Sequence, residues 1–397
     1  MNARDKSPFQ GAIDVRRRLE DLALWHEEWR AEEAYLDQLL AAIGDSTSEI
    51  DIQKSAGIGV LRNRLELQQV RIPLEISLDA IKAIGYTKLR HQMVSQFVQL
   101  SQEERLRWLS NFLFIMTPDL RRLNEKIARV RGYRSFGQKR NFLLGAVSGM
   151  GKTTYLNWFA SNYLPQKERE RNHVPIIMID APEGNSPKPL FQRIIRACGA
   201  SYLERDTEEM LINKTAHFFQ KCSVEVLIID EVEHIKYHAV RRRLLELSNM
   251  THHVPIICSS CNPEEWIKND PEIEGRWNDY FRIERYTGAR LQQLLIYINL
   301  LLPLSQDSFL SSDPKKKAPA EREGKNASIA FVQRVTRGKL GNIMLLIREA
   351  TRAAIEGNLP CLDETLLRQT WDNIQTKPAK IETFNKEIIQ PPKEEEE

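Results

Sequence analysis

Residues 142–154 contain the feature that most restricts the fold of this chain. The apolar run Phe142–Leu144 leads into a glycine-rich loop, Gly145–Gly151, and a helical pattern begins at Lys152–Thr154. A strand, a glycine-rich turn and a helix that opens with Lys and Thr are the parts of a phosphate-binding loop. Glycines let the backbone curve until its N–H groups point inward, and the helix N-terminus adds partial positive charge. The sequence therefore predicts a nucleotide-binding α/β fold.

The side chains of this loop have distinct expected roles. Lys152 is expected to reach the β- and γ-phosphates of ATP, and the Thr153 hydroxyl to bind Mg²⁺. Contacts to the nucleotide are expected from Gly149, Met150, Gly151, Lys152, Thr153 and Thr154. The spacing departs from the usual motif once, since Ala146 stands where its first glycine is expected and Gly145 lies one place earlier.

A second motif follows about eighty residues later. The apolar run Val226–Ile229 ends in two acids, Asp230 and Glu231. A carboxylate at the end of a buried strand lies beside the phosphate loop, where Asp230 is expected to bind Mg²⁺. Glu231 is expected to polarise the water that attacks the γ-phosphate.

Five short apolar runs alternate with helical patterns through the middle of the chain. They cover residues 142–144, 175–179, 224–229, 254–258 and 281–286. Such alternation predicts a five-stranded parallel sheet with helices on both faces, with 281–286 toward an edge. The adjacent acids indicate the P-loop branch with an extra strand between the two motif strands, which includes AAA+ and RecA-like ATPases. That extra strand is 254–258, and Asn262 beyond it is expected to orient water against the γ-phosphate.

The pattern changes suggest four parts of the chain. We expect a helical N-terminal region over 1–135 and a nucleotide-binding core over 136–287. A small helical lid is expected over 288–375, with a flexible polar insertion at 305–326. The last part, 376–397, is expected to be a disordered acidic tail. Within the first part, Ser101 and Glu104 have the spacing of a capping box.

Charge is unevenly distributed, although the net charge is only +3. The segment from 121 to 140 has one acid, Glu125, and these basic residues: Arg121, Arg122, Lys126, Arg129, Arg131, Arg134, Lys139 and Arg140. Such a block either binds a phosphate backbone or an acidic partner, or is a solvated helix face. We interpret Lys315–Lys317 as solvated charge.

Several classes are excluded or disfavoured. No run approaches the roughly 20 apolar residues of a membrane span, and the N-terminus lacks the apolar core of a signal peptide. Five cysteines, an odd number, fit reduced thiols in the cytoplasm. Cys258 and Cys261 have no second pair to complete a metal site, so we interpret them as small residues at a strand end.

Several segments together resemble the TnsC/TniB AAA+ regulators of DNA transposition. They are the phosphate loop, Leu227–His234, Leu244–Asn249 before 254–257, Gly275–Trp277, and Gly338–Ala350, which resembles the family's lid helix. The resemblance covers about 120–356. It implies that Arg276 is an arginine finger for the ATP of the neighbouring subunit, which makes hydrolysis depend on assembly.

The resemblance also implies partners. TnsC-like proteins form ATP-bound rings or helical filaments on duplex DNA and link a target-selection protein, in some systems a CRISPR effector, to the transposase. Contacts to DNA phosphates are carried over to Lys188, Thr207 and Lys214. The lid arginine that often senses γ-phosphate falls on Met344 here, and Lys339 or Arg348 are its possible substitutes.

Two other functions stay open from the sequence. One is a P-loop ATPase of signalling or defence that nucleates an assembly without DNA. The other is a helicase loader or replication initiator, although no helix-turn-helix module follows the lid.

Overall fold

The computed structural model describes most of the chain between residues 14 and 376. Within that span it leaves out 44–58, 62–63, 66–84, 113–115, 133–140, 168–171, 185, 252–253, 269, 278 and 310–318. The acidic tail from residue 377, Lys315–Lys317 and the basic residues Arg134, Lys139 and Arg140 lie outside the described residues. No helix among those described is long and apolar enough to cross a membrane.

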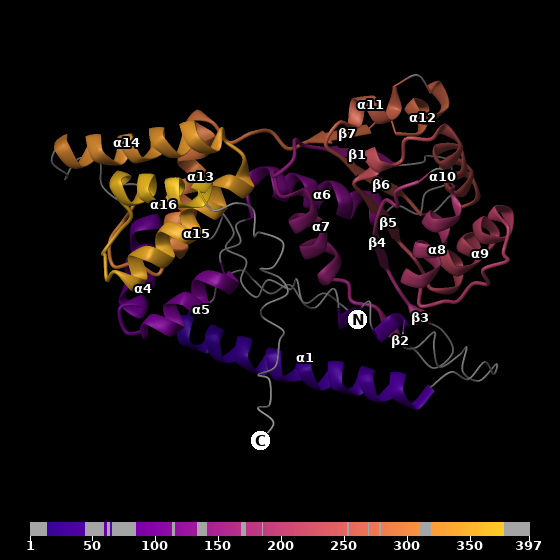
Figure 1. Ribbon diagram of the computed structural model, residues 1–397, viewed down its shortest axis with the longest axis horizontal. Helices are drawn as coiled ribbons and strands as arrows, with labels where there is room; N and C mark the ends of the chain where they lie inside the picture. The colour runs from indigo at the N-terminus through magenta and orange to yellow at the C-terminus, as the bar shows by residue number, and fades with distance from the viewer. Residues whose placement is uncertain are drawn as a thin grey trace.

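The centre of the molecule is a parallel sheet in the order β4-β5-β6-β1-β7 (Figure 1). Its strands are β1 (Phe142–Gly145), β4 (Ile176–Asp180), β5 (Val226–Asp230), β6 (Ile256–Ser260) and β7 (Asp279–Arg282). This confirms the predicted fold class, and β6 is the extra strand between the two motif strands. A separate antiparallel pair is formed by β2 (Gln166–Lys167) and β3 (Asn172–His173).

Helices cover both faces of the sheet because alternate strand residues point to opposite sides. Phe142 and Leu144 of β1 pack with α6 (Pro118–Gly132) and α7 (Lys152–Ser161), whereas Leu143 packs with the helices of the other face. Those helices are α8 (Lys188–Ala197), α9 (Glu208–Lys221) and α10 (His238–Met250), drawn on the right of Figure 1. The short elements η1 (Val232–His234), α11 (Pro263–Ile267) and α12 (Pro271–Arg276) complete this lobe.

The edge strand β7 differs from its prediction. It lies at 279–282 rather than 281–286, and it pairs with β1 alone. Ile283 N donates one more hydrogen bond to Gly145 O at 2.9 Å. Beyond it the Tyr286 hydroxyl donates to Thr117 and the Tyr286 N–H to Gly338 O, both at 2.9 Å. These contacts direct the chain away from the sheet and into the lid.

The lid consists of α13 (Gly288–Leu301), α14 (Pro319–Thr336), α15 (Leu340–Glu356) and α16 (Glu364–Thr376). Residues 319–326, expected within the polar insertion, belong to α14, because Pro at the first position and the Ala, Glu and Arg that follow favour a helix start. The insertion's first residues are also packed, with Ser308 and Phe309 buried.

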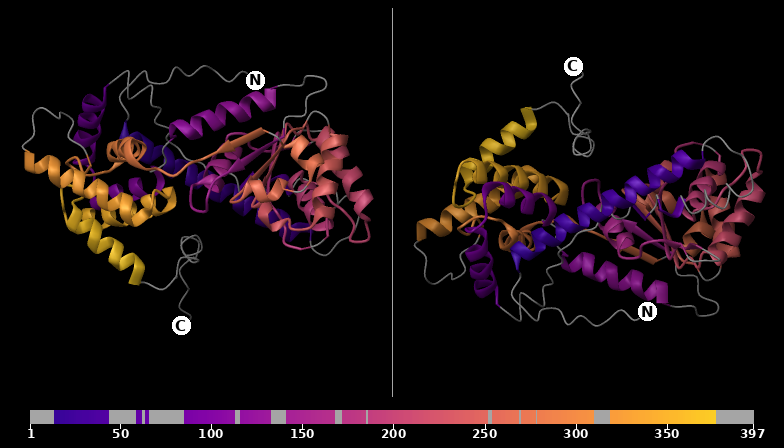
Figure 2. Two further views of the ribbon diagram at one scale, coloured as in Figure 1. Left: turned by 90° about the horizontal axis from the view of Figure 1, so that it is seen from above. Right: turned by 90° about the horizontal axis from the view of Figure 1, so that it is seen from below.

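The N-terminal helices pack against the lid as well as the sheet. They are α1 (Val15–Ile43), α4 (Tyr86–Phe97), α5 (Gln102–Phe112) and α6. The buried Arg90 of α4 donates to the carbonyls of Leu302 and Leu304, each at 2.9 Å, and Trp108 of α5 donates to Leu301 O at 3.0 Å. Figure 2 shows the long α1 running from these helices toward the sheet lobe. The predicted capping box is present, since Glu104 N donates to Ser101 Oγ and Ser101 N to Glu104 Oε2.

Candidate functional site

The phosphate loop connects the end of β1 to the start of α7. Gly151 is the N-cap of α7 and has φ of 83°, a left-handed conformation that side chains rarely adopt. Gly145 is required for another reason, because a Cβ there would lie 2.5 Å from the Tyr280 hydroxyl and 2.7 Å from Pro263. The early glycine therefore serves packing against β7 and α11, which leaves Ala146 as the first residue of the loop proper.

Lys152 places a buried positive charge in this loop. The residue is 7% exposed, and its ammonium donates to Ala146 O at 2.8 Å and lies 3.9 Å from Cys261 Sγ. Among the described residues it has no carboxylate partner. Burying a charge is costly unless a counter-ion is present. An anion in the loop would supply that counter-ion.

Asp230 places a buried negative charge beside the same loop. Its side chain is fully buried at the end of β5, where Oδ2 accepts from the Thr153 hydroxyl at 2.5 Å and Oδ1 from Glu231 N at 2.9 Å. Within the described chain it forms no ion pair. A hydroxyl and a carboxylate oxygen in contact are the hard ligands that Mg²⁺ prefers, together with phosphate oxygens. The residues predicted for phosphate and metal thus meet at one edge of the sheet.

Glu231 adopts a conformation that the sequence did not reveal. Its φ of 55° and ψ of 40° are left-handed, which is uncommon for a residue with a Cβ. Such strain persists where the surroundings enforce it, and it occurs often at functional sites. The side chain is 52% exposed, and its Oε2 lies 3.9 Å from His234 Nδ1. The carboxylate is thus accessible at the edge where Asp230 is buried.

Two residues that follow the end of β6, Cys261 and Asn262, have different surroundings. Cys261, not Asn262, lies near Lys152, and Cys261 N donates to both carboxylate oxygens of Glu233 at 3.3 Å. Asn262 is exposed and precedes α11, where its side chain forms no capping hydrogen bond. Ser259, one strand position beyond the Cys258–Ile229 pair, has a buried hydroxyl without a partner in the described chain. The sequence indicated this strand end but could not select the side chain, because adjacent positions point in different directions.

The lid touches the phosphate loop directly. Gly341 N, at the start of α15, donates to Gly149 O at 2.7 Å, and the Leu340 side chain packs over Gly151. A Cβ on Gly341 would lie 3.0 Å from Gly149 O. Of the two possible substitutes for a lid arginine, Lys339 is the residue that immediately precedes this contact.

Arg276 is the last residue of α12 and is partly exposed. Within the described part of the chain it forms no ion pair. An ordinary surface salt bridge of Arg276 is therefore not observed among the described residues.

The three candidate DNA contacts have different surroundings. Lys188 is the half-buried first residue of α8, and Thr207 caps α9 by accepting from Met210 N at 3.3 Å. A 3.4 Å hydrogen bond from Ser186 to Glu208 joins the starts of these two helices. Lys214 is already paired, since its ammonium lies 2.7 Å from the buried Asp206, and this hydrogen bond lowers the pKa of Asp206.

The described part of the basic block is largely neutralised by neighbours. Lys126 pairs with Asp279 at 2.5 Å, Arg131 pairs with Glu225, and Arg122 pairs with Asp119. Arg131 also lies over the Tyr163 ring, 3.8 Å from its centroid. The contacts of Lys126 and Arg131 fasten α6 to the sheet lobe, while the Arg122 pair lies within α6 itself, which favours a structural role for this stretch of the block.

Comparisons with known proteins give one family match and a set of distantly similar structures. Residues 105–286 match the family model described as bacterial TniB protein. Similar solved structures include the Orc1 protein of Aeropyrum pernix in complex with DNA, with 15% identity, 64% of each chain covered and a TM-score of 0.43. Cdc6p of Pyrobaculum aerophilum has 12% identity, with 66% of this chain and 69% of that chain covered and a TM-score of 0.48. The RuvB branch-migration motor of Thermotoga maritima has 14% identity, with 70% of this chain and 71% of that chain covered and a TM-score of 0.39.

No curated protein matches the sequence. The chain spans just under two thirds of the Orc1 protein's length. The stretch from 105 to 286 is thus similar to the TniB family, and the strand order of its sheet is that of an α/β P-loop ATPase fold.

Proposed function

We propose that the chain is an ATP-dependent, DNA-binding regulator of transposition that hydrolyses ATP. The observation that carries the nucleotide part is the pair of buried, opposite charges on Lys152 and Asp230, neither ion-paired within the described chain. A nucleotide triphosphate with Mg²⁺ supplies both missing partners at once. No other described part of the molecule combines a glycine-rich loop with such a pair.

The residues at this edge have separate roles in the proposal. The backbone from Gly149 to Thr154 and the Lys152 ammonium hold the phosphates, and Thr153 and Asp230 hold Mg²⁺, which neutralises charge on the phosphate oxygens. Glu231 is accessible and accepts a proton from the attacking water. Asn262 or a neighbouring polar group on β6 orients that water.

Assembly is the second part of the proposal. Arg276 is delivered to the nucleotide of the next subunit, so a ring or filament hydrolyses ATP and a single subunit does not. The assembly forms on duplex DNA through phosphate contacts from the starts of α8 and α9, with Lys188 as the principal candidate. It links a target-selection protein, or a CRISPR effector, to the transposase.

Hydrolysis measured with and without duplex DNA tests this function. We expect Mg²⁺-dependent ATP turnover that rises with protein concentration and with DNA, and no turnover by Lys152→Ala. Lys167→Ala, which changes an exposed lysine on β2, is the matched control and should behave as wild type. ATP turnover without any response to DNA or to protein concentration would support the signalling or defence alternative instead.

A further inference from the structure

The helix that carries Arg276 is attached to the segment that follows the Asp230–Glu231 motif. Helix α12 is short, Pro271–Arg276, and it contributes only Ile273 and the adjacent Trp277 to the core. Ile273 and Trp277 are both buried, so packing holds the middle and the end of this helix. Polar contacts hold its start, and together with this packing they place its last residue.

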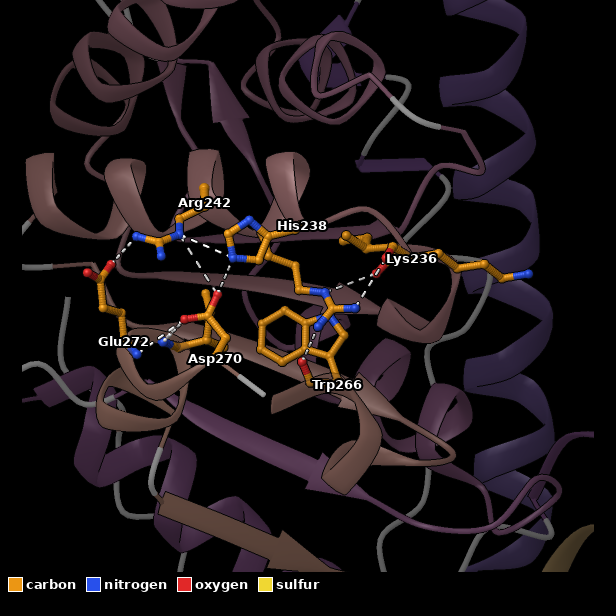
Figure 3. Close-up of polar contacts among 9 residues, drawn as sticks. Lys236, His238, Arg242, Trp266, Asp270 and Glu272 are labelled. Carbon is orange, nitrogen blue, oxygen red and sulfur yellow. Dashed lines mark hydrogen bonds and ion pairs between the residues drawn. The ribbon is translucent and has the colours of Figure 1, made fainter. Parts of the chain in front are cut away.

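Asp270 makes most of those contacts, and Glu272 adds an ion pair with Arg242 of α10. Asp270 is 3% exposed, and its Oδ1 accepts from Glu272 N and Ile273 N, each at 3.2 Å, which caps α12. Its Oδ2 lies 2.8 Å from His238 Nε2 and 3.9 Å from Arg242 Nε, and both partners belong to α10. Figure 3 shows His238 and Arg242 extending from α10 toward Asp270.

His238 lies between Arg242 and Asp270. Nε2 lies 3.3 Å from Arg242 Nε, which is itself a donor, and 2.8 Å from the Asp270 carboxylate, which can only accept. Arg242 Nε thus donates to His238 Nε2, and the imidazole lies between this guanidinium and the Asp270 carboxylate. Burial raises the pKa of Asp270, but the hydrogen bond from Ile273 and the charges of Arg242 and His238 together hold this pKa below its usual value.

A second set of contacts fixes the neighbouring segment. Arg241 donates to Trp266 O at 2.8 Å, at the end of α11, and to the carbonyls of Ile235 and Lys236 at 3.4 and 3.3 Å. Trp266 in turn packs edge-on against Trp277, with ring centroids 5.3 Å apart. The turn after η1, α11 and both ends of α12 thus form one connected unit.

We infer that His238 and Asp270 are positioning residues for Arg276, which hold α12 so that Arg276 is presented to the nucleotide of the adjoining subunit. The inference rests on the proposed role of Arg276 in trans. In this inference, the contact between α10 and α12 determines the position of Arg276. Since α10 follows the Asp230–Glu231 motif by only a few residues, the contact also connects a subunit's own nucleotide site to the arginine it gives away.

Asp270→Asn is the variant that isolates this role. Asn is as good an N-cap as Asp, so α12 keeps its cap, but the neutral amide loses the charged contacts with His238 and Arg242. A misplacement of about 1 Å in a catalytic group can cost roughly 10²-fold, so we expect ATP turnover by the assembled protein to fall by about 10- to 10²-fold. Binding of ATP should be unchanged, since Lys152, Thr153 and Asp230 are untouched.

Mixed assemblies separate positioning from a general structural defect. Asp270→Asn subunits retain Glu231 but present Arg276 poorly, whereas Glu231→Gln subunits lack the base but present Arg276 normally. Equal mixtures should therefore hydrolyse ATP several-fold faster than either variant alone. A defect within the subunit's own site would not be restored by mixing, as Lys152→Ala mixed with Glu231→Gln should demonstrate.

Two further variants complete the experiment. Asp363→Asn makes the same chemical change at the start of α16, where Asp363 accepts from Leu366 N at 2.8 Å, and it should leave turnover unchanged. Arg276→Ala mixed with Glu231→Gln should be restored; if it is not, the trans role of Arg276 fails, and the inference fails with it. If Arg276→Ala is restored but Asp270→Asn either has wild-type turnover or is not restored by mixing, the inference alone is overturned.

Discussion

Two buried aspartates distinguish the nucleotide edge of the sheet from the surface at the starts of α8 and α9. Asp230 is fully buried and forms no ion pair within the described chain, and its contacts are a hydroxyl and a backbone N–H. Asp206 is equally buried, but Lys214 lies 2.7 Å away. The charge of a buried carboxylate with a paired cation is already compensated, whereas one without a cation is prepared for a cation that arrives with a ligand.

The same contrast applies to the lysines of the two regions. Lys152 is buried against a carbonyl, while Lys214 is already paired and Lys188 is half-solvated at the start of a helix. At the sheet edge the candidate residues contact one another. On α8 and α9 each candidate is surrounded by its own local structure. The residues proposed to bind nucleotide and metal thus meet within one subunit, whereas a DNA site would be completed only by repetition along an assembly.

The largest expected effect is that of Lys152→Ala. Removing the buried ammonium removes the cation that the loop contributes to the phosphates, so nucleotide binding should be abolished. Titration with a fluorescent ATP analogue measures this, with Lys167→Ala as the control. If Lys152→Ala bound the ATP analogue with unchanged affinity, the sheet edge would not be a nucleotide site. The contrast between the unpaired Asp230 and the paired Asp206 would then say nothing about ligand binding.

Glu231→Gln should separate binding from hydrolysis. Loss of a general base slows turnover by roughly 10²- to 10⁴-fold, while Lys152, Thr153 and Asp230 still bind ATP and Mg²⁺. Oligomers in the ATP form should therefore accumulate, as seen by size-exclusion chromatography with light scattering. Wild-type turnover by this variant would assign the base to another residue.

Lys214→Ala should affect stability more than DNA affinity. The substitution leaves Asp206 buried and unpaired, and because Lys214 is partly exposed we expect a loss of about 1 kcal/mol at pH 7. The paired carboxylate has a lowered pKa, so its contribution is fully present above the usual value of 3.8 and is lost as pH falls through the lowered value. Urea unfolding of the wild type and of Lys214→Ala should therefore show different free energies of unfolding at neutral pH. This difference should become smaller in strong acid. A large loss of DNA affinity with unchanged stability would contradict this assignment.

Lys188→Ala should have the smallest effect and the most specific one. Each phosphate contact contributes about 0.9 to the slope of log affinity against log salt concentration, so the slope should become shallower by about one unit per subunit, equally for all DNA sequences. Lys221→Ala, at the opposite end of α9, is the matched control. An unchanged slope for Lys188→Ala would remove this residue from the DNA surface.

The sequence predicted the nucleotide edge better than any other region because its geometry is a property of the backbone. Strand β1, the loop and the end of β5 occur where the motifs indicated. The sequence did not predict the left-handed conformation of Glu231 or the approach of Cys261 to Lys152. Both depend on the backbone angles of single residues just after a strand ends.

Long-range packing explains the other differences. The helical periodicity of α4 and α5 predicted helices, but it could not show that Arg90 and Trp108 would fasten them to backbone carbonyls of the lid more than 190 residues away. Likewise, β7 ends where Tyr286 binds the lid rather than where its alternating pattern ends. The domain boundaries drawn from the sequence therefore stay predictions, because contacts cross from the N-terminal region to both lobes.

The most direct test of the account is negative-stain microscopy of the protein on duplex DNA of arbitrary sequence. With ATP and Mg²⁺ we predict rings or helical filaments on the DNA for the wild type and persistent ones for Glu231→Gln, and none for Lys152→Ala or without nucleotide. Assemblies that form equally well without ATP, or ATP-dependent assemblies that never include DNA, would contradict it.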